Sequence, residues 1–464
     1  MQVSNFLDKM TGGLLVVLAA LVVVTEWGSG AWPDMALPWL IIPLIALLTV
    51  RVGPGRYVFV IVAVGLTLAL AVTNPDWISI TNKGLQTAAF IAAFFSALAT
   101  LRSAAASSPS ISRSGRFLAQ QPPGMRYIAL TVGGQMFALL LNYGAIALLG
   151  SLATASANEE PDAEIRRHRT RRMLLAIQRA FTSTLPWSPL SFAVAISLAL
   201  IPGAQWVDVV IPGVVTSVLM AGTGWALDSI FKPRLSRARP APVPPEGTWT
   251  LMLPLVALLA ILVSSLVILH FMTDVRTVGL VLLIVPVIAV IWTVMQAWGA
   301  TDDPGFWRRV GDYAFVELPG FRGEILLLMM AGYIGTVGAP LLLPLLLGLG
   351  VDLSLVPTPV VLVALVWIIP LAGQIGMNPI LVVTLIAPLV PSAESLGVEP
   401  TAVVVAITAG WALSGVTSPF TATTLFIGSF GKVSASHVGL KWNGSYALIT
   451  ACILSIWVLV FANL

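Results

Sequence analysis

The sequence predicts an all-α polytopic membrane protein, and both its composition and the length of its apolar stretches support this class. Of 464 residues, 58% are hydrophobic and only 9% are charged, whereas a soluble domain carries about 25% charged residues. The apolar stretches are about 20 residues long, which suits membrane-spanning helices rather than barrel strands. We therefore expect a multi-pass protein of the lipid bilayer, in a bacterial-type inner (plasma) membrane.

Hydropathy predicts about eleven membrane spans. They cover 12–26, 34–50, 57–73, 85–104, 173–200, 206–230, 249–271, 277–299, 323–348, 401–430 and 443–463. Two further apolar stretches, 123–152 and 356–392, have polar centres that read "GGQMFALLLNYG" and "GQIGMNP". We interpret these two stretches as re-entrant hairpins, each of which enters and leaves on the same side of the membrane.

The distribution of basic residues supports this topology. With the N-terminus in the cytoplasm and both hairpins re-entrant, all Lys and Arg residues except Lys83 and Arg276 fall in cytoplasmic segments. Arg179 is counted with the basic loop that precedes its span, and no Lys or Arg is expected well inside a span. Counting either hairpin as a full crossing would move every later loop to the other side. The C-terminus is therefore expected outside.

The order of the elements repeats. Gly134-Gln135 corresponds to Gly373-Gln374, and Ser188-Pro189 corresponds to Ser418-Pro419. Each unit contains a span, a hairpin, a broken span and a span, and the units begin on spans four and nine. Because that separation is odd, the two units cross the membrane in opposite senses, as inverted-topology repeats do.

This pattern predicts five segments. They are N-terminal scaffold spans (1–84), a first repeat (85–230, with hairpin 123–152 and broken span 173–200), a cytoplasmic linker (231–249), scaffold spans with an interfacial connector (250–322), and a second repeat (323–464, with hairpin 356–392 and broken span 401–430).

Ser-Pro pairs in "TLPWSPLSF" and "GVTSPFTAT" predict that two spans are interrupted. Proline lacks the backbone N–H, so it frees the carbonyl four residues earlier. The freed carbonyls belong to Thr182, Leu185 and Gly415, and nearby hydroxyls belong to Ser183, Thr184, Ser188, Ser414, Thr417 and Ser418. Such oxygen ligands suit Na⁺. One Ser-Pro pair alone is better explained as a kink, but two matched pairs with matched hairpins favour a functional site.

Backbone donors on the other side of each break suit an anion. The half-helices that start after each break expose N–H groups and a partial positive charge, and the hairpins add amide side chains. The predicted substrate-binding residues are Gln135, Asn142, Trp187, Ser191, Gln374, Asn378 and Thr421. For Gln135 and Gln374, hydrogen bonding between helices is an equal alternative. For Trp187, core packing is the preferred alternative.

Two inverted halves, each with a hairpin followed by a span broken at a hydroxyl-Pro sequence, resemble the ion transporter superfamily. The architecture is most similar to that of the divalent anion/sodium symporters, although the breaks here read "PWSPLS" and "TSPFTA". The resemblance implies one Na⁺ held near Gly134, Gln135, Thr184 and Ser188, and a second near Gly373, Gln374 or Asn378 and Thr417 or Ser418. It also implies a substrate between the two hairpins, a homodimer and elevator-type alternating access.

We therefore predict a secondary active transporter for a small organic anion, with a carboxylate as the leading class and Na⁺ as the coupling ion. No carboxylate stands in an obvious place within a span, which favours Na⁺ over H⁺. The alternative is an H⁺-coupled carrier or an exchanger of another solute, for which Asp228 is the best-placed acid. A channel would explain the hairpins but does not require matched breaks.

Other classes find little support in the sequence. It has no zincin histidine pair and no serine-nucleophile elbow, so we expect no enzyme and no cofactor besides the coupling ion. Three scattered histidines and one cysteine predict no metal cluster or disulfide framework. The basic residues lie in short loops rather than in one patch, so no nucleic-acid partner is expected.

Overall fold

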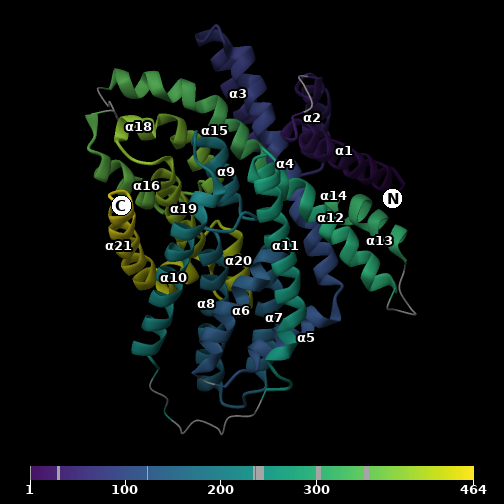
Figure 1. The fold of residues 1–464 in the computed structure, drawn as a ribbon, viewed down its shortest axis with the longest axis vertical. Helices are drawn as coiled ribbons and strands as arrows, with labels where there is room; N and C mark the ends of the chain where they lie inside the picture. Colours follow the sequence, from purple (N-terminus) through teal and green to yellow (C-terminus); the bar gives the residue numbers. More distant parts are fainter. Residues whose placement is uncertain are drawn as a thin grey trace. The chain divides into compact units, whose positions relative to one another are not determined.

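The computed structural model describes residues 2–28, 32–122, 124–233, 236, 245–298, 305–349 and 355–464, and every regular element in these ranges is a helix (Figure 1). The predicted all-helical class is confirmed. Most of the predicted linker 231–249 lies outside the described residues, as do 299–304 of the predicted connector.

The chain forms two compact units. Unit 1 contains Met1–Ala104, Leu262–Leu355 and Ile380–Val390, and unit 2 contains Ala105–Ile261, Val356–Pro379 and Pro391–Leu464. Both units are therefore assembled from segments that are far apart in the sequence.

Unit 1 contains mostly long apolar helices. Its elements are α1 (Gln2–Glu26), α2 (Trp32–Val50), α3 (Pro54–Thr73), α4 (Trp77–Ala106), α12 (Thr277–Trp298), α13 (Phe306–Asp312), η2 (Tyr313–Glu317), α14 (Leu318–Gly320), α15 (Arg322–Gly348), α17 (Pro379–Ile386) and η4 (Ala387–Leu389), together with the second half of α11 (Leu253–Met272). Helix α15 packs on α4 at Gly332, which lies against Ile91, and on α3, where Tyr333 shares a 2.6 Å hydrogen bond with Thr67. A small residue at such a crossing lets two helices approach closely.

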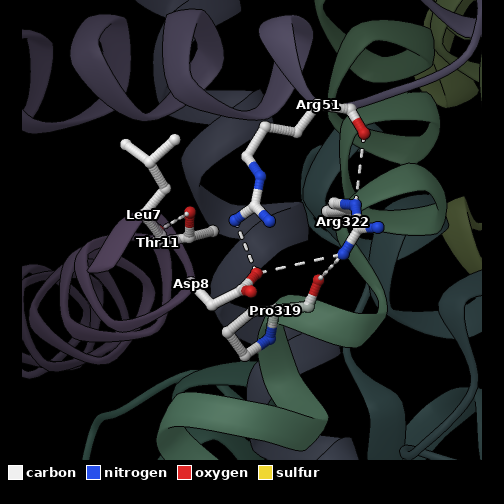
Figure 2. A network of polar contacts seen from close by, with 6 residues as sticks. All are labelled: Leu7, Asp8, Thr11, Arg51, Pro319 and Arg322. Carbon is white, nitrogen blue, oxygen red and sulfur yellow. Dashed lines mark hydrogen bonds and ion pairs between the residues drawn. The ribbon is translucent and has the colours of Figure 1, made fainter. Parts of the chain in front are cut away.

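One carboxylate joins three segments of unit 1 (Figure 2). Asp8 of α1 lies 2.5 Å from the Arg51 guanidinium and 3.9 Å from that of Arg322. The Arg322 guanidinium also donates to the Arg51 carbonyl at 3.2 Å. This network ties the start of α1 to the turn before α3 and to the start of α15.

Unit 2 contains shorter helices and the interruptions that the sequence predicts. Its elements are α5 (Pro109–Ala119), α6 (Met125–Leu141), α7 (Tyr143–Asn158), α8 (Ala163–Thr184), α9 (Phe192–Leu200), α10 (Trp206–Ile230), η1 (Trp249–Met252), α16 (Thr358–Gln374), α18 (Ala393–Leu396), α19 (Pro400–Thr417), α20 (Ala422–Gly431), η5 (His437–Trp442) and α21 (Gly444–Phe461), with the first half of α11. Helix α8 packs on α6, α7, α10 and α19, and α19 also packs on α16 and α21. Helices α8 and α19 are therefore the centre of this unit.

Nine helices in the described ranges are long and apolar enough to cross a membrane. This agrees with a polytopic membrane protein. Two of the predicted spans are not among these nine: 34–50 corresponds to a shorter apolar helix, Met35–Val50, and 173–200 corresponds to α8 and α9 with a gap between them.

Proline alone does not end a helix in this chain. Several helices continue through internal prolines at Pro38, Pro43, Pro212, Pro286, Pro340, Pro344 and Pro370. By contrast, α8 ends before the first Ser-Pro pair and α19 ends before the second. The neighbouring hydroxyls, which provide alternative partners for the backbone, distinguish these two positions.

Candidate functional site

The first break separates α8, which ends at Thr184, from α9, which begins at Phe192. Ser188 Oγ accepts a hydrogen bond from the Leu190 amide at 3.1 Å. Ser191 caps α9 by accepting from the Val194 amide at 3.2 Å, and its hydroxyl donates to the Leu185 carbonyl at 2.8 Å. The carbonyl that Pro189 frees is thus satisfied inside the break.

The second break follows the same plan. Helix α19 ends at Thr417 and α20 begins at Ala422. Ser418 Oγ accepts from the Phe420 amide at 3.3 Å, as Ser188 does from Leu190. The carbonyl that Pro419 frees, that of Gly415, accepts a hydrogen bond from the Thr423 hydroxyl. Both of these carbonyls therefore accept hydrogen bonds from hydroxyl donors in this conformation.

A cluster of hydroxyls follows the second break. Thr424 Oγ1 donates to the Ser418 carbonyl at 2.6 Å, and Thr421 Oγ1 lies 2.9 Å from Thr423 Oγ1 and 3.1 Å from Thr424 Oγ1. Sequence reasoning selected Thr421 but missed Thr423 and Thr424. The available signal for Thr423 and Thr424 was the sequence "TATT", because its spacing places three hydroxyls within one helical turn.

The first hairpin consists of α6 and α7, and its turn is at Asn142, which has φ of 49°. Gly133, Gly134 and Gln135, at the polar centre of the predicted hairpin 123–152, lie in the middle of α6 rather than at the turn of the hairpin. Gly134 and Gln135 face α8: Gln135 Nε2 donates to Ser183 Oγ at 3.0 Å. A Cβ on Gly134 would lie 2.8 Å from Ala180 Cβ.

In the stretch 356–392, which the sequence predicts as the second hairpin, the candidate residues lie where α16 ends. Gly373 and Gln374 close α16, and Asn378 immediately precedes α17. The Gly373 carbonyl accepts from Ser418 Oγ at 2.6 Å, and a Cβ on Gly373 would lie 2.6 Å from Ser414 Oγ. The Ser414 hydroxyl is fully buried and has no hydrogen-bond partner. Backbone and hydroxyl oxygens of Gly373, Ser414 and Ser418 are thus gathered at the second break.

Three other predicted side chains form hydrogen bonds within their own helices, and Trp187 forms one through its carbonyl. The hydroxyls of Thr184 and Thr417 donate back to Phe181 and Leu413 of their own helices, at 2.7 Å and 2.9 Å. Gln374 Nε2 likewise donates to the Pro370 carbonyl of α16 at 3.3 Å. The Trp187 carbonyl accepts from Trp206 Nε1 at 3.0 Å, while its own indole N–H is buried without a partner.

Two residues that sequence reasoning missed connect the broken helices to each other. Gln178 of α8 is fully buried, and its Nε2 donates to the carbonyls of Gly415 at 3.4 Å and Val416 at 3.3 Å. Asn443, also fully buried, donates through Nδ2 to Gln178 Oε1 at 2.9 Å. The end of α19 is thus held by an amide from the other repeat.

Arg179 corrects the expectation that no basic residue lies well inside a span. It is only 5% exposed, its Nε donates to Asn443 Oδ1 at 3.1 Å, and Nη1 donates to the Tyr127 hydroxyl at 3.2 Å. Its position at the end of a basic run made it look like part of the cytoplasmic loop. The apolar "MLLAI" that separates it from Arg172 was the available signal.

Asp228, the acid that a proton-coupled mechanism would use, forms an ion pair. Arg172 holds it in a bidentate geometry, with Nε 2.8 Å from Oδ1 and Nη2 2.5 Å from Oδ2. The hydrogen bonds to Asp228 raise the pKa of Arg172 above its ordinary value. Across the described residues, no three His, Cys, Asp or Glu side chains gather as a metal site.

Comparison with known proteins finds solved structures of similar architecture. No family model and no curated protein sequence matches the chain. Among the solved structures that match, the YdaH transporter of Alcanivorax borkumensis gives a TM-score of 0.53 and 16% identity. The match covers 92% of this chain and 98% of that chain. MtrF of Neisseria gonorrhoeae, described within a class of antimetabolite efflux pumps, gives a TM-score of 0.55, 15% identity and coverage of 90% and 97%.

The chain has the fold of membrane transporters. The match extends over nearly the whole of each protein, so it concerns the complete architecture rather than one motif. The finer resemblance to the divalent anion/sodium symporters remains a prediction.

Proposed function

We propose that this protein is a secondary active transporter that moves a small organic anion, with a carboxylate as the leading class, and that Na⁺ drives it by elevator-type alternating access. The observation that carries the proposal is the pair of matched interruptions in α8–α9 and α19–α20, where α8 packs against α6 and α19 packs against α16. Irregular backbone at membrane depth is retained only where it is buried or lines a binding cavity.

The second break supplies the stronger cation site. The Gly373 carbonyl, Ser414 Oγ and Ser418 Oγ are hard oxygen ligands in a buried place. A buried hydroxyl without a partner costs about 1–3 kcal/mol, and Ser414 is such a group. A bound Na⁺ would offset that cost. At the first break, the proposed ligands are Gly134, Thr184 and Ser188, as the resemblance implies.

The starts of α9 and α20 are the proposed anion side of the site. Each is the N-terminus of a half-helix, where the helix dipole favours negative charge. The substrate would be contacted by Gln135, Asn142, Trp187, Ser191, Gln374, Asn378 and Thr421. We further propose a homodimer in a bacterial-type inner membrane, and light scattering of the purified protein would measure its mass.

Transport in proteoliposomes tests the function directly. Uptake of radiolabelled benzoate, succinate and glutamate would be measured under an imposed Na⁺ gradient, a pH gradient, or neither. We expect saturable uptake of at least one acid that follows the Na⁺ gradient. Large flux that does not saturate would instead indicate a channel. Uptake that follows only the pH gradient and disappears in Asp228→Asn would replace Na⁺ with H⁺.

A further inference from the structure

Arg179 is a buried cation whose direct partners are all neutral. Asn443 and Tyr127 accept from its guanidinium, and the Tyr446 ring lies beneath it, with Cζ 4.1 Å from the ring centroid. In the part of the chain that the structure describes, no carboxylate lies within ion-pair distance of Arg179. This arrangement is uncommon because buried charges are normally paired.

The nearby acid cannot neutralise this charge. Asp228 follows Gly224 by one turn of α10, and Gly224 lies against both Arg179 and Tyr127. However, both Asp228 oxygens are already bound by Arg172. The carboxyl ends of α8 and α19 offer partial negative charge, but the favourable energy of a helix terminus is smaller than the desolvation cost of a buried ion. One positive charge therefore remains without a counterion.

The guanidinium also has unused donors. Arginine carries five N–H groups, and the hydrogen bonds of Arg179 engage Nε and Nη1 only. Its free donors form a planar fork, the geometry that matches a carboxylate in two parallel hydrogen bonds.

Arg179 is connected to the second break. Asn443 accepts from Arg179 through Oδ1 and donates through Nδ2 to Gln178, and Gln178 donates to the carbonyls of Gly415 and Val416. Every member of this chain of hydrogen bonds is buried. A change in the partners of Arg179 therefore reaches the break at which we place the cation.

We propose that Arg179 is an anion-binding residue, and that it takes the carboxylate of a small solute as the counterion that it lacks. The proposal rests on the proposed function, since it gives the transported anion a specific positive partner. Asn443 and Tyr127 hold the guanidinium while the site is empty, and binding of the carboxylate uses the N–H groups that remain.

The test measures the thermal stability of the full-length purified protein in detergent. Sodium benzoate, succinate, chloride and phosphate are titrated at constant Na⁺ concentration and constant ionic strength. A ligand that binds only the native state raises Tm with increasing concentration. We expect stabilisation by at least one carboxylate, with an apparent Kd that rises by tenfold or more in Arg179→Gln and by less in Arg179→Lys. Arg171→Gln, which removes an exposed charge from the same helix, is the matched control and should bind like wild type.

Several results would overturn the proposal. They are the absence of carboxylate stabilisation in wild type, equal stabilisation by chloride or phosphate, or unchanged carboxylate affinity in Arg179→Gln. If Arg179→Gln does not fold, Tyr127→Phe decides: it keeps the guanidinium and removes one neutral acceptor, so affinity should be kept or improved, and its loss contradicts the proposal. If carboxylate binding depends on Arg179 but transport does not depend on Na⁺, only the proposed Na⁺ coupling is refuted. If Na⁺-driven uptake is unaffected in Arg179→Gln, only the carboxylate site at Arg179 is refuted.

Discussion

The hydroxyl of Ser418 donates a 2.6 Å hydrogen bond to the carbonyl of Gly373, and this bond joins α19 to the end of α16. The first repeat makes a corresponding contact by different means, because there Gln135 of α6 donates to Ser183 of α8 at 3.0 Å. The two repeats therefore share an architecture, in which α6 contacts α8 and α16 contacts α19 before each interruption. Only in the second repeat is the acceptor at this contact a main-chain oxygen.

Ser418→Ala should weaken the Na⁺ dependence of uptake more than Ser188→Ala. The Ser418 hydroxyl accepts from an amide of its own turn and donates to the Gly373 carbonyl of α16. The hydrogen bond of the Ser188 hydroxyl lies within its own turn. Loss of a ligand worth about 1.4 kcal/mol changes affinity roughly tenfold, and we expect a change of that order at Ser418. The half-saturating Na⁺ concentration and the Tm of both variants would be measured. If both substitutions leave Na⁺ dependence unchanged, the Ser-Pro pairs are kinks only.

Gly373→Ala should disrupt the second break. The new Cβ would lie 2.6 Å from Ser414 Oγ and 3.0 Å from Ser418 Cβ, so α16 or α19 must move. Overpacking of this kind costs about 1–3 kcal/mol. We expect a lower Tm and a loss of Na⁺-driven uptake. Gly222→Ala is the control, because its Cβ would meet nothing within 4 Å on α10. Equal behaviour of the two variants would contradict the close packing described here.

Gln178 and Asn443 should behave as one unit. Each is fully buried, and Asn443 donates to Gln178 at 2.9 Å. Replacing either residue by Leu removes the hydrogen bond between them and leaves the other buried amide with one partner fewer, so the double variant should lose less stability than the sum of the single variants. The expected coupling is about 0.5–3 kcal/mol, measured by Tm or by denaturation. Gln374→Leu, which removes an amide that bonds its own helix, should show no coupling with Asn443→Leu.

Arg172→Gln should destabilise the protein by leaving Asp228 without its counterion. The Asp228 side chain is 10% exposed and that of Arg172 is 29% exposed. We therefore expect a cost of about 1–3 kcal/mol, between the values for exposed and for buried pairs. The double variant Arg172→Gln with Asp228→Asn should recover part of this loss, since it removes both charges. A double variant that is less stable than Arg172→Gln would show that the pair is not isolated, and a pH titration of uptake would then show whether Asp228 carries protons.

Composition and local covalent chemistry were enough to predict the class and the interruptions. A chain with this apolar content must be a membrane protein, since its helices cannot be hidden from water in any soluble fold. Ser188-Pro189 and Ser418-Pro419 end their helices for reasons that lie within a few residues: a missing N–H and neighbouring hydroxyls that satisfy the backbone.

Tertiary structure alone decided which polar side chains meet. Asn443 and Arg179 are 264 positions apart, and no local pattern shows that they form a hydrogen bond. Gly134 and Gln135 lie in mid-helix because Asn142, rather than the glycine pair, adopts the turn conformation. Arg179 is part of a basic run by sequence, yet it is buried because Tyr127 of α6, Gly224 of α10 and Tyr446 of α21 lie against it. Sequence periodicity reports how each helix forms, but the counterion and hydrogen-bond partners of a buried group come from distant segments that only the packed chain brings together.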